Sequence, residues 1–179
     1  MPDPEYLALD DFAREVRRLV AADTPAPEIE RFLAGTRIER TSLDRVSRFE
    51  EGRYTRHLVL KTPEVEVLVL CWRRGSRAPI HGHEGERCWA RVERGRLLFR
   101  SYREVSRDPL RLEPLGATVD GGPGHVDGPA DIHAVDNAAE RGEDAVTVHV
   151  YSRPYDECDI YDPERGVVER VRLRYDSVS

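Results

Sequence analysis

The segment from Val65 to Trp72 constrains the fold most, because it is rich in β-branched residues and is apolar on both faces. Strands of this kind are buried on both sides. Further short strands are expected at Tyr54–Leu60, Ile80–His83, Cys88–Glu93, Leu97–Tyr102 and Ala145–Tyr151, with turns at Arg74-Gly75, Arg94-Gly95 and along Gly121–Pro129. Many short strands separated by regular turns predict a mostly β sandwich or barrel.

Two helices are expected before the strands. Apolar residues recur at helical spacing from Leu7 to Ala22, and Asp10-Asp11 lies near the start, where negative charge favours a helix. A second, shorter helix covers Glu28–Leu33 and ends near Gly35. Both are predicted to pack on an outer face and not to form a site. Residues 38–49 show no clear pattern, and residues 167–175 are expected to be either a last strand or a docking arm.

Length and composition favour one domain over residues 1–179, with a helical segment at residues 1–36. The net charge of −6 argues against a nucleic-acid partner. Cys71, Cys88 and Cys158 lack disulfide-framework spacing, which favours a reducing cytosol. No signal segment and no apolar run of about 18 residues is present, so we expect a cytoplasmic protein without membrane contact. Lys61 is the only lysine among 28 basic residues, which is typical of a GC-rich bacterial genome.

The sequence His81-Gly82-His83 is the centre of the most informative stretch. In an extended strand, residues i and i+2 share a face, so two imidazoles side by side make half of a metal site. One such pair among six histidines is weak support by itself. The surrounding frame of Gly75, the two histidines and Gly95 resembles the first cupin motif. In that motif the position of Cys88 usually holds a glutamate that binds metal.

A third histidine ligand must come from elsewhere in the chain. The candidates are His57, His125, His133 and His149. His133 is favoured, because its spacing to Asn137 resembles the end of the second cupin motif, although Ala130 stands where that motif usually has glycine. His125 lies in the Gly/Pro-rich run and is expected at the surface.

The segment Val146–Tyr151 alternates cleanly between three valines and a second set, Thr147, His149 and Tyr151. The hydroxyl, imidazole and phenol either line a polar cavity or form the solvent face of an outer strand. Taken with Tyr54-Thr55-Arg56, Leu70-Cys71-Trp72, the histidines and Cys88, this strand resembles the cysteine dioxygenases, the thiol dioxygenases of the cupin superfamily. The matched segments run from Tyr54 to Cys158.

This resemblance implies a mostly β cupin fold, a small jelly-roll barrel with the N-terminal helices packed outside and a catalytic core at about residues 54–155. It implies one Fe(II) per chain on His81, His83 and His133. The substrate would be L-cysteine, bound through its thiolate and amine beside O₂, and the product would be cysteine sulfinic acid. Three neutral imidazoles leave the ion its full charge, which favours an anionic sulfur ligand.

By the same resemblance, Arg56 grips the substrate carboxylate and Tyr54 adds a hydrogen bond. Trp72 helps to wall the pocket. Tyr151 donates a hydrogen bond in the site, and His149 orients it with Thr147 behind. Some members of the family link the cysteine and tyrosine side chains that match Cys88 and Tyr151 by a thioether bond, so this crosslink is expected beside the alternative of a free buried thiol.

One departure concerns the segment after Tyr151, where Ser152-Arg153-Pro154 replaces the family's Ser-Pro-Pro. A cis peptide at Ser152-Arg153 would cost roughly 3 kcal/mol, so the peptide is either trans or held under strain. Arg153 also adds a cation near the pocket in sequence. Arg56 favours cysteine over 3-mercaptopropionate, whose related enzymes carry glutamine there. A dioxygenase of another small thiol and a non-catalytic metal-binding cupin remain as alternatives, and a monomer or weak homo-oligomer is expected.

Overall fold

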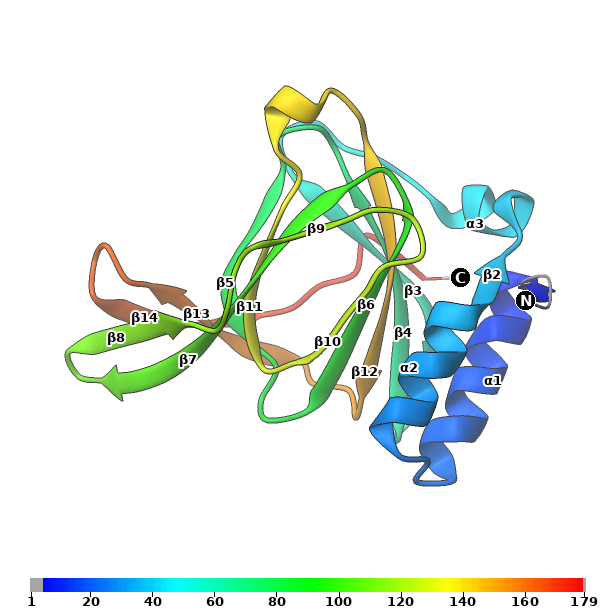
Figure 1. The fold of residues 1–179 in the computed structure, drawn as a ribbon, viewed down its shortest axis with the longest axis horizontal. Coiled ribbons are helices and arrows are strands. Elements are labelled where there is room, and N and C mark those ends of the chain that lie inside the picture. The colour runs from blue at the N-terminus through cyan, green and yellow to red at the C-terminus, as the bar shows by residue number, and fades with distance from the viewer. Residues whose placement is uncertain (1–4, 179) are drawn as a thin grey trace.

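A computed structural model describes residues 5–178 (Figure 1). The first sheet contains β3 (Tyr54–Lys61), β4 (Val65–Trp72), β6 (Arg87–Arg94), β10 (Val126–Ala130), β12 (Ala145–Ser152) and β15 (Ser177–Val178). The second contains β5 (Arg77–Gly82), β7 (Leu97–Arg107), β8 (Leu110–Pro114), β9 (Val119–Gly121), β11 (Ile132–Asp136), β13 (Glu157–Asp162) and β14 (Val167–Arg172).

The strand order is β10-β6-β12-β4-β3-β15 in the first sheet and β14-β13-β5-β11-β7-β8 in the second, where β9 also pairs with β7. Both sheets curl toward each other and enclose a barrel, and two hairpins, β7–β8 and β13–β14, project from one side (Figure 1). The predicted mostly β cupin barrel with helices outside is confirmed.

The N-terminal helices cover the outer face of the first sheet (Figure 1). They are α1 (Leu9–Ala21) and α2 (Ala26–Gly35), followed by a short α3 (Arg40–Val46), and β1 (Glu5–Leu7) pairs in parallel with β2 (Thr36–Ile38). A 3₁₀ turn, η1, spans Ala139–Arg141. Within residues 5–178, no helix is long and apolar enough to span a membrane.

Alternation along β4 and β12 explains why the helices pack there. Val67 and Val69 of β4 and Val148 of β12 point outward and form one buried cluster with Phe12 and Ile29 of the helices. Burial of each such side chain contributes about 1.5–3 kcal/mol, so this layer fixes the helices on the barrel. The expectation that the helices serve packing agrees with this arrangement.

The opposite faces of the same strands line the barrel interior. Leu68 and Trp72 of β4 belong to the inner cluster together with Tyr151 of β12. Every residue of β12 is buried, so the alternative of a solvent face for Thr147, His149 and Tyr151 is wrong. The alternation predicted the strand, but it did not reveal that the N-terminal helices cover its valine face.

Some predicted boundaries and loops differ from the structure. Residues 38–49, which lacked a clear pattern, contain α3. The Gly/Pro-rich run assigned to a turn contains β10, an irregular strand whose register against β6 shifts between Asp127 and Ala130. Residues 167–172 form β14, which pairs with β13, so this part of the tail is a strand.

The segment after Tyr151 adopts a trans arrangement at Ser152–Arg153, since the cis peptides among the described residues lie elsewhere. Arg153 has φ +79°, in the left-handed region, and its N–H donates to the Glu64 carbonyl at 2.8 Å. The departure from the family sequence is therefore accommodated by a turn at Arg153, while β12 keeps its regular pairing through Ser152.

Candidate metal centre

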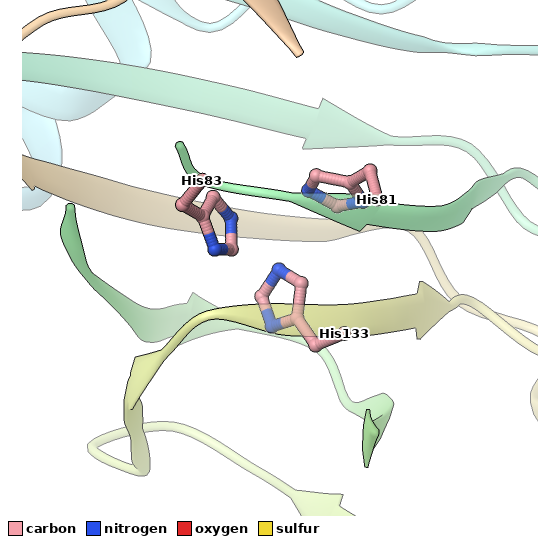
Figure 2. Close-up of side chains that lie close together, drawn as sticks. All are labelled: His81, His83 and His133. Carbon is pink, nitrogen blue, oxygen red and sulfur yellow. The ribbon is translucent and has the colours of Figure 1, made fainter. Parts of the chain in front are cut away.

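Three histidines from two neighbouring strands meet inside the barrel (Figure 2). His81 lies on β5, His83 directly follows it, and His133 lies on β11 opposite His81 in the antiparallel register. Their ring centroids are 4.8 Å apart for His81 and His133, 4.7 Å for His83 and His133, and 5.0 Å for His81 and His83. One ring nitrogen of each lies within 4.8 Å of the others, an arrangement able to hold one metal ion.

Each imidazole is oriented by an acceptor at its Nδ1 atom. His81 Nδ1 lies 2.8 Å from the Pro79 carbonyl, and His83 Nδ1 lies 3.0 Å from the Ala130 carbonyl. His133 Nδ1 lies 3.2 Å from Asp127 Oδ2. These contacts place the hydrogen on Nδ1 and leave the Nε2 lone pair available, as the hydrogen-bond acceptors behind metal-bound histidines do.

Two imidazole nitrogen atoms of the cluster lack the hydrogen-bond partners that are usual in a protein interior. The Nε2 atoms of His83 and His133 are buried and have no hydrogen-bond partner among the described residues. Buried polar atoms are almost always paired, so orphaned atoms that face one another indicate a missing ligand. The donor set of three neutral nitrogens fits a first-row transition-metal ion.

The electrostatic setting keeps His81 and His83 neutral. Burial, and then the neighbouring His133 imidazole, lower the pKa of His81 to about 3. The same two causes lower the pKa of His83 well below its ordinary value. Metal ligands must be deprotonated, so these two imidazoles can bind a cation at neutral pH without first losing protons.

A line of hydrogen bonds runs along the interior face behind Tyr151. Trp72 Nε1 donates to Thr147 Oγ1 at 2.9 Å, and Thr147 Oγ1 lies 2.9 Å from His149 Nε2. His149 Nδ1 lies 3.3 Å from the Tyr151 hydroxyl. Because the indole can only donate, a consistent assignment lets Thr147 donate to His149 and His149 to the phenol oxygen. The Tyr151 hydrogen is then free to point into the site.

Cys88 lies on β6 directly opposite Tyr151 on β12. Both side chains are buried. Burial raises the pKa of Cys88 and of Tyr151, so both groups stay protonated at neutral pH. The structure therefore brings the two predicted crosslink partners side by side.

Arg56 and Tyr54 enter the same region from β3. They line a small cavity together with His81, and the Tyr54 ring stacks on Trp72 with ring centroids 4.7 Å apart. Arg56 is half-buried, and its Nε atom is buried without a hydrogen-bond partner among the described residues. A cation with an unpaired donor beside the histidine cluster is suited to an anionic ligand.

Tyr155 and Cys158 line this cavity too, and sequence reasoning did not assign them to the site. The Tyr155 ring packs edge-on against Tyr151 with ring centroids 5.4 Å apart, and lies 6.1 Å from the His83 ring. Tyr155 lies outside any strand, and Cys158 lies on β13 two residues before Ile160, which lines the cavity as well; this alternation was not used to predict the site. Asp127, the partner of His133, was hidden in the Gly/Pro-rich run.

The cavity has a volume of about 30 Å³, which holds about one water molecule. Tyr155 also lines an outer depression of about 350 Å³, with Glu84 and Arg170 on its rim. Tyr155 thus separates the solvent side from the histidine side.

Other candidates from the sequence lie outside the cluster. His57 points to the other face of β3, where Nδ1 lies 2.8 Å from Ser177 Oγ and Nε2 lies 2.9 Å from the Arg48 carbonyl. His125 is half-buried, packs against Phe99 with ring centroids 5.4 Å apart, and is not part of the histidine cluster. Arg153 is exposed and does not line the described cavity, so it adds no cation there.

Comparison of the sequence with known proteins identifies the family of this chain. The model of the family "Cysteine dioxygenase type I" matches residues 7–164. Cysteine dioxygenase type 1 of Homo sapiens is 25% identical over 174 residues, covering 94% of this chain and 86% of the human protein. The Danio rerio protein of that name is 23% identical over 172 residues, covering 93% and 85%.

Solved structures with a similar fold include a Klebsiella pneumoniae protein described as having a double-stranded beta-helix domain. Its TM-score is 0.46 at 19% identity, and the match covers 68% of this chain and 95% of that one. The family model covers most of the sequence, including the three histidines, Arg56 and Tyr151. The chain belongs to the cysteine dioxygenase type I family.

Proposed function

We propose that the protein is an Fe(II)-dependent thiol dioxygenase that adds both atoms of O₂ to the sulfur of L-cysteine, giving cysteine sulfinic acid. One observation carries this proposal: the cavity that touches His81 also contains the guanidinium of Arg56. A metal site and an anion site in one small cavity suit a thiol that carries a carboxylate. Family membership and the named relatives support the same reaction class.

His81, His83 and His133 would hold the ion through their Nε2 atoms, with one ion per chain. The three ligating groups include no carboxylate, so the donor set is neutral and favours an anionic sulfur ligand. Fe(II) supplies the redox chemistry that activates O₂, which zinc in the same site could not supply. The Nδ1 contacts of the imidazoles keep the ligand geometry fixed during binding.

Arg56 would bind the substrate carboxylate with its planar fork, which presents parallel N–H donors. Tyr54 lies beside the Arg56 guanidinium and would add a phenol hydrogen bond. Trp72 stacks on the Tyr54 ring and backs this side of the cavity. Together these side chains fix the carboxylate end of the substrate, so that the thiol end reaches the histidines.

Tyr151 would hold a hydrogen bond toward the reacting sulfur and oxygen atoms. Thr147 donates to His149, and His149 donates to the phenol oxygen of Tyr151, which leaves the Tyr151 hydrogen pointing into the cavity. Burial raises the pKa of Tyr151 well above its ordinary value, so the phenol remains a donor throughout the neutral range. The line of contacts therefore orients Tyr151 and does not ionise it.

We also propose that Cys88 and Tyr151 form a thioether bond between the sulfur and a ring carbon. The reaction removes one hydrogen from each side chain and is a two-electron oxidation, for which O₂ is the oxidant. Their direct opposition on β6 and β12 supports this step. Because the bond would tie the phenol to a second strand, it would restrict the motion of Tyr151.

The test is O₂ uptake and sulfinate formation by iron-loaded protein with L-cysteine, 3-mercaptopropionate and cysteamine, beside zinc-loaded protein. The proposal expects turnover of L-cysteine with iron and none with zinc. Preference for 3-mercaptopropionate would reassign the substrate to a thiol without an amine. Absence of turnover with all three thiols would leave a metal-binding cupin without this catalytic activity.

A further inference from the structure

The C-terminal segment from Leu173 to Val178 crosses the barrel and lies against β3, the strand that carries Arg56 (Figure 1). It leaves β14 with the Leu173 N–H donating to the Asp156 carbonyl at 2.8 Å, and ends as β15 in parallel pairing with β3. This C-terminal strap, residues 173–178, lies beyond the residues matched by the family model, which end at residue 164.

One residue of the C-terminal strap holds both backbone groups of Arg56. The Arg56 N–H donates to Asp176 Oδ2 at 2.7 Å, and the Asp176 N–H donates to the Arg56 carbonyl at 2.7 Å. Asp176 Oδ1 also accepts a hydrogen bond from Arg53 at 2.5 Å. β3 would otherwise leave these groups of Arg56 unpaired on the side away from β4.

Two more residues of the strap reach the interior. Leu173 lines the small cavity beside Arg56, so the strap forms part of its wall. Tyr175 packs against the inner cluster, donates its hydroxyl hydrogen to the buried carboxylate of Glu66, and accepts a hydrogen bond from Lys61 at 2.8 Å. The strap therefore forms hydrogen bonds with residues of the chain before and after Arg56, namely Arg53 and Lys61.

The side chain of Arg56 lies beside the Tyr54 phenol. The Nε atom of Arg56 is buried and has no hydrogen-bond partner among the described residues, so no hydrogen bond to that atom fixes the guanidinium. A bidentate clamp requires its origin to be fixed within a fraction of an ångström. We propose that Asp176 and the C-terminal strap are positioning elements for Arg56, which set the guanidinium in place for the carboxylate of a thiol substrate.

This inference rests on the proposed function, because it concerns the same carboxylate clamp. It predicts a selective effect. Loss of the Asp176 side chain should weaken binding of a thiol with a carboxylate, and should spare cysteamine, which has none. If Asp176 served only general stability, its loss would weaken the binding of both thiols alike.

The test compares Asp176→Ala with the wild-type protein and with Asp44→Ala, a control that removes an exposed aspartate from its Arg40 and Arg94 partners. Anaerobic calorimetry with iron-loaded protein measures the Kd of L-cysteine and of cysteamine. We expect the Kd of L-cysteine to rise about three- to tenfold in Asp176→Ala. The Kd of cysteamine should change less than about twofold, and the control should match the wild type.

Hydrogen exchange gives a second readout that does not depend on activity. The Arg56 amide should exchange faster in Asp176→Ala, while amides of β12 keep their protection. If this variant does not fold, Asp176→Asn keeps an acceptor for the Arg56 N–H and should show a smaller shift in the same direction. An equal shift for both thiols, or an unchanged Kd of L-cysteine in a folded variant, would overturn the inference. Failure of the proposed function would show separately, as wild-type protein that turns over no thiol.

Discussion

Replacement of Arg56 by alanine removes the guanidinium from the cavity that also touches His81. A hydrogen bond to a charged group contributes about 1.5–3 kcal/mol, and truncation of one partner of a buried charged pair costs about 2–5 kcal/mol. Arg56 is only half-buried, which places the expected loss at about 2–4 kcal/mol. Since about 1.4 kcal/mol corresponds to tenfold, kcat/KM for L-cysteine should fall about 30- to 1,000-fold.

The assay is initial O₂ uptake with L-cysteine and with cysteamine, using protein of equal iron content. Arg56→Lys keeps the charge but loses the planar fork, so it should recover only part of the lost activity with L-cysteine. Arg153→Gln is the matched control, because Arg153 is exposed and does not line the cavity. Equal losses with both thiols in Arg56→Ala would refute the carboxylate clamp.

Further predictions concern the metal, the crosslink and acid stability. His133→Ala should lower the metal content after dialysis from about one ion per chain to near zero, whereas His125→Ala should leave it unchanged. Cys88→Ser should abolish the mass loss of a pair of hydrogen atoms that marks the bond to Tyr151 in intact-mass spectra. Although burial alone would raise it, the pKa of Asp176 is held below 3.8 by hydrogen bonds from the Arg53 side chain and the Arg56 N–H. These hydrogen bonds to the Asp176 carboxylate contribute to the free energy of unfolding, and their contribution is fully present above pH 3.8. It should be lost as the pH falls through the lowered pKa that Asp176 has in the folded protein, which urea titrations at a series of pH values measure.

Sequence periodicity predicted the parts of the site that lie on regular strands. His81 and His83 share a face because they are two residues apart, and the alternation of β12 placed Thr147, His149 and Tyr151 together. The meeting of His133 with that pair came from the resemblance to a motif, because no local pattern specifies which distant strands become neighbours.

The remaining residues of the site depend on contacts that sequence spacing does not encode. Asp127 lies on a strand whose glycine and proline residues are typical of a turn. Tyr155 reaches the cavity from an irregular segment after the Arg153 turn. Asp176 meets Arg56 across 120 positions of sequence, so only the folded barrel shows that they touch.

The most direct test of the central claim follows the oxygen atoms. Iron-loaded protein is supplied with L-cysteine and ¹⁸O₂, and the sulfinate product is analysed by mass spectrometry. A thiol dioxygenase at the three-histidine site predicts that both sulfinate oxygens carry the label, and that the His133→Ala protein forms no labelled product. Product with label in only one oxygen, or labelled sulfinate formed equally by His133→Ala, would contradict the account.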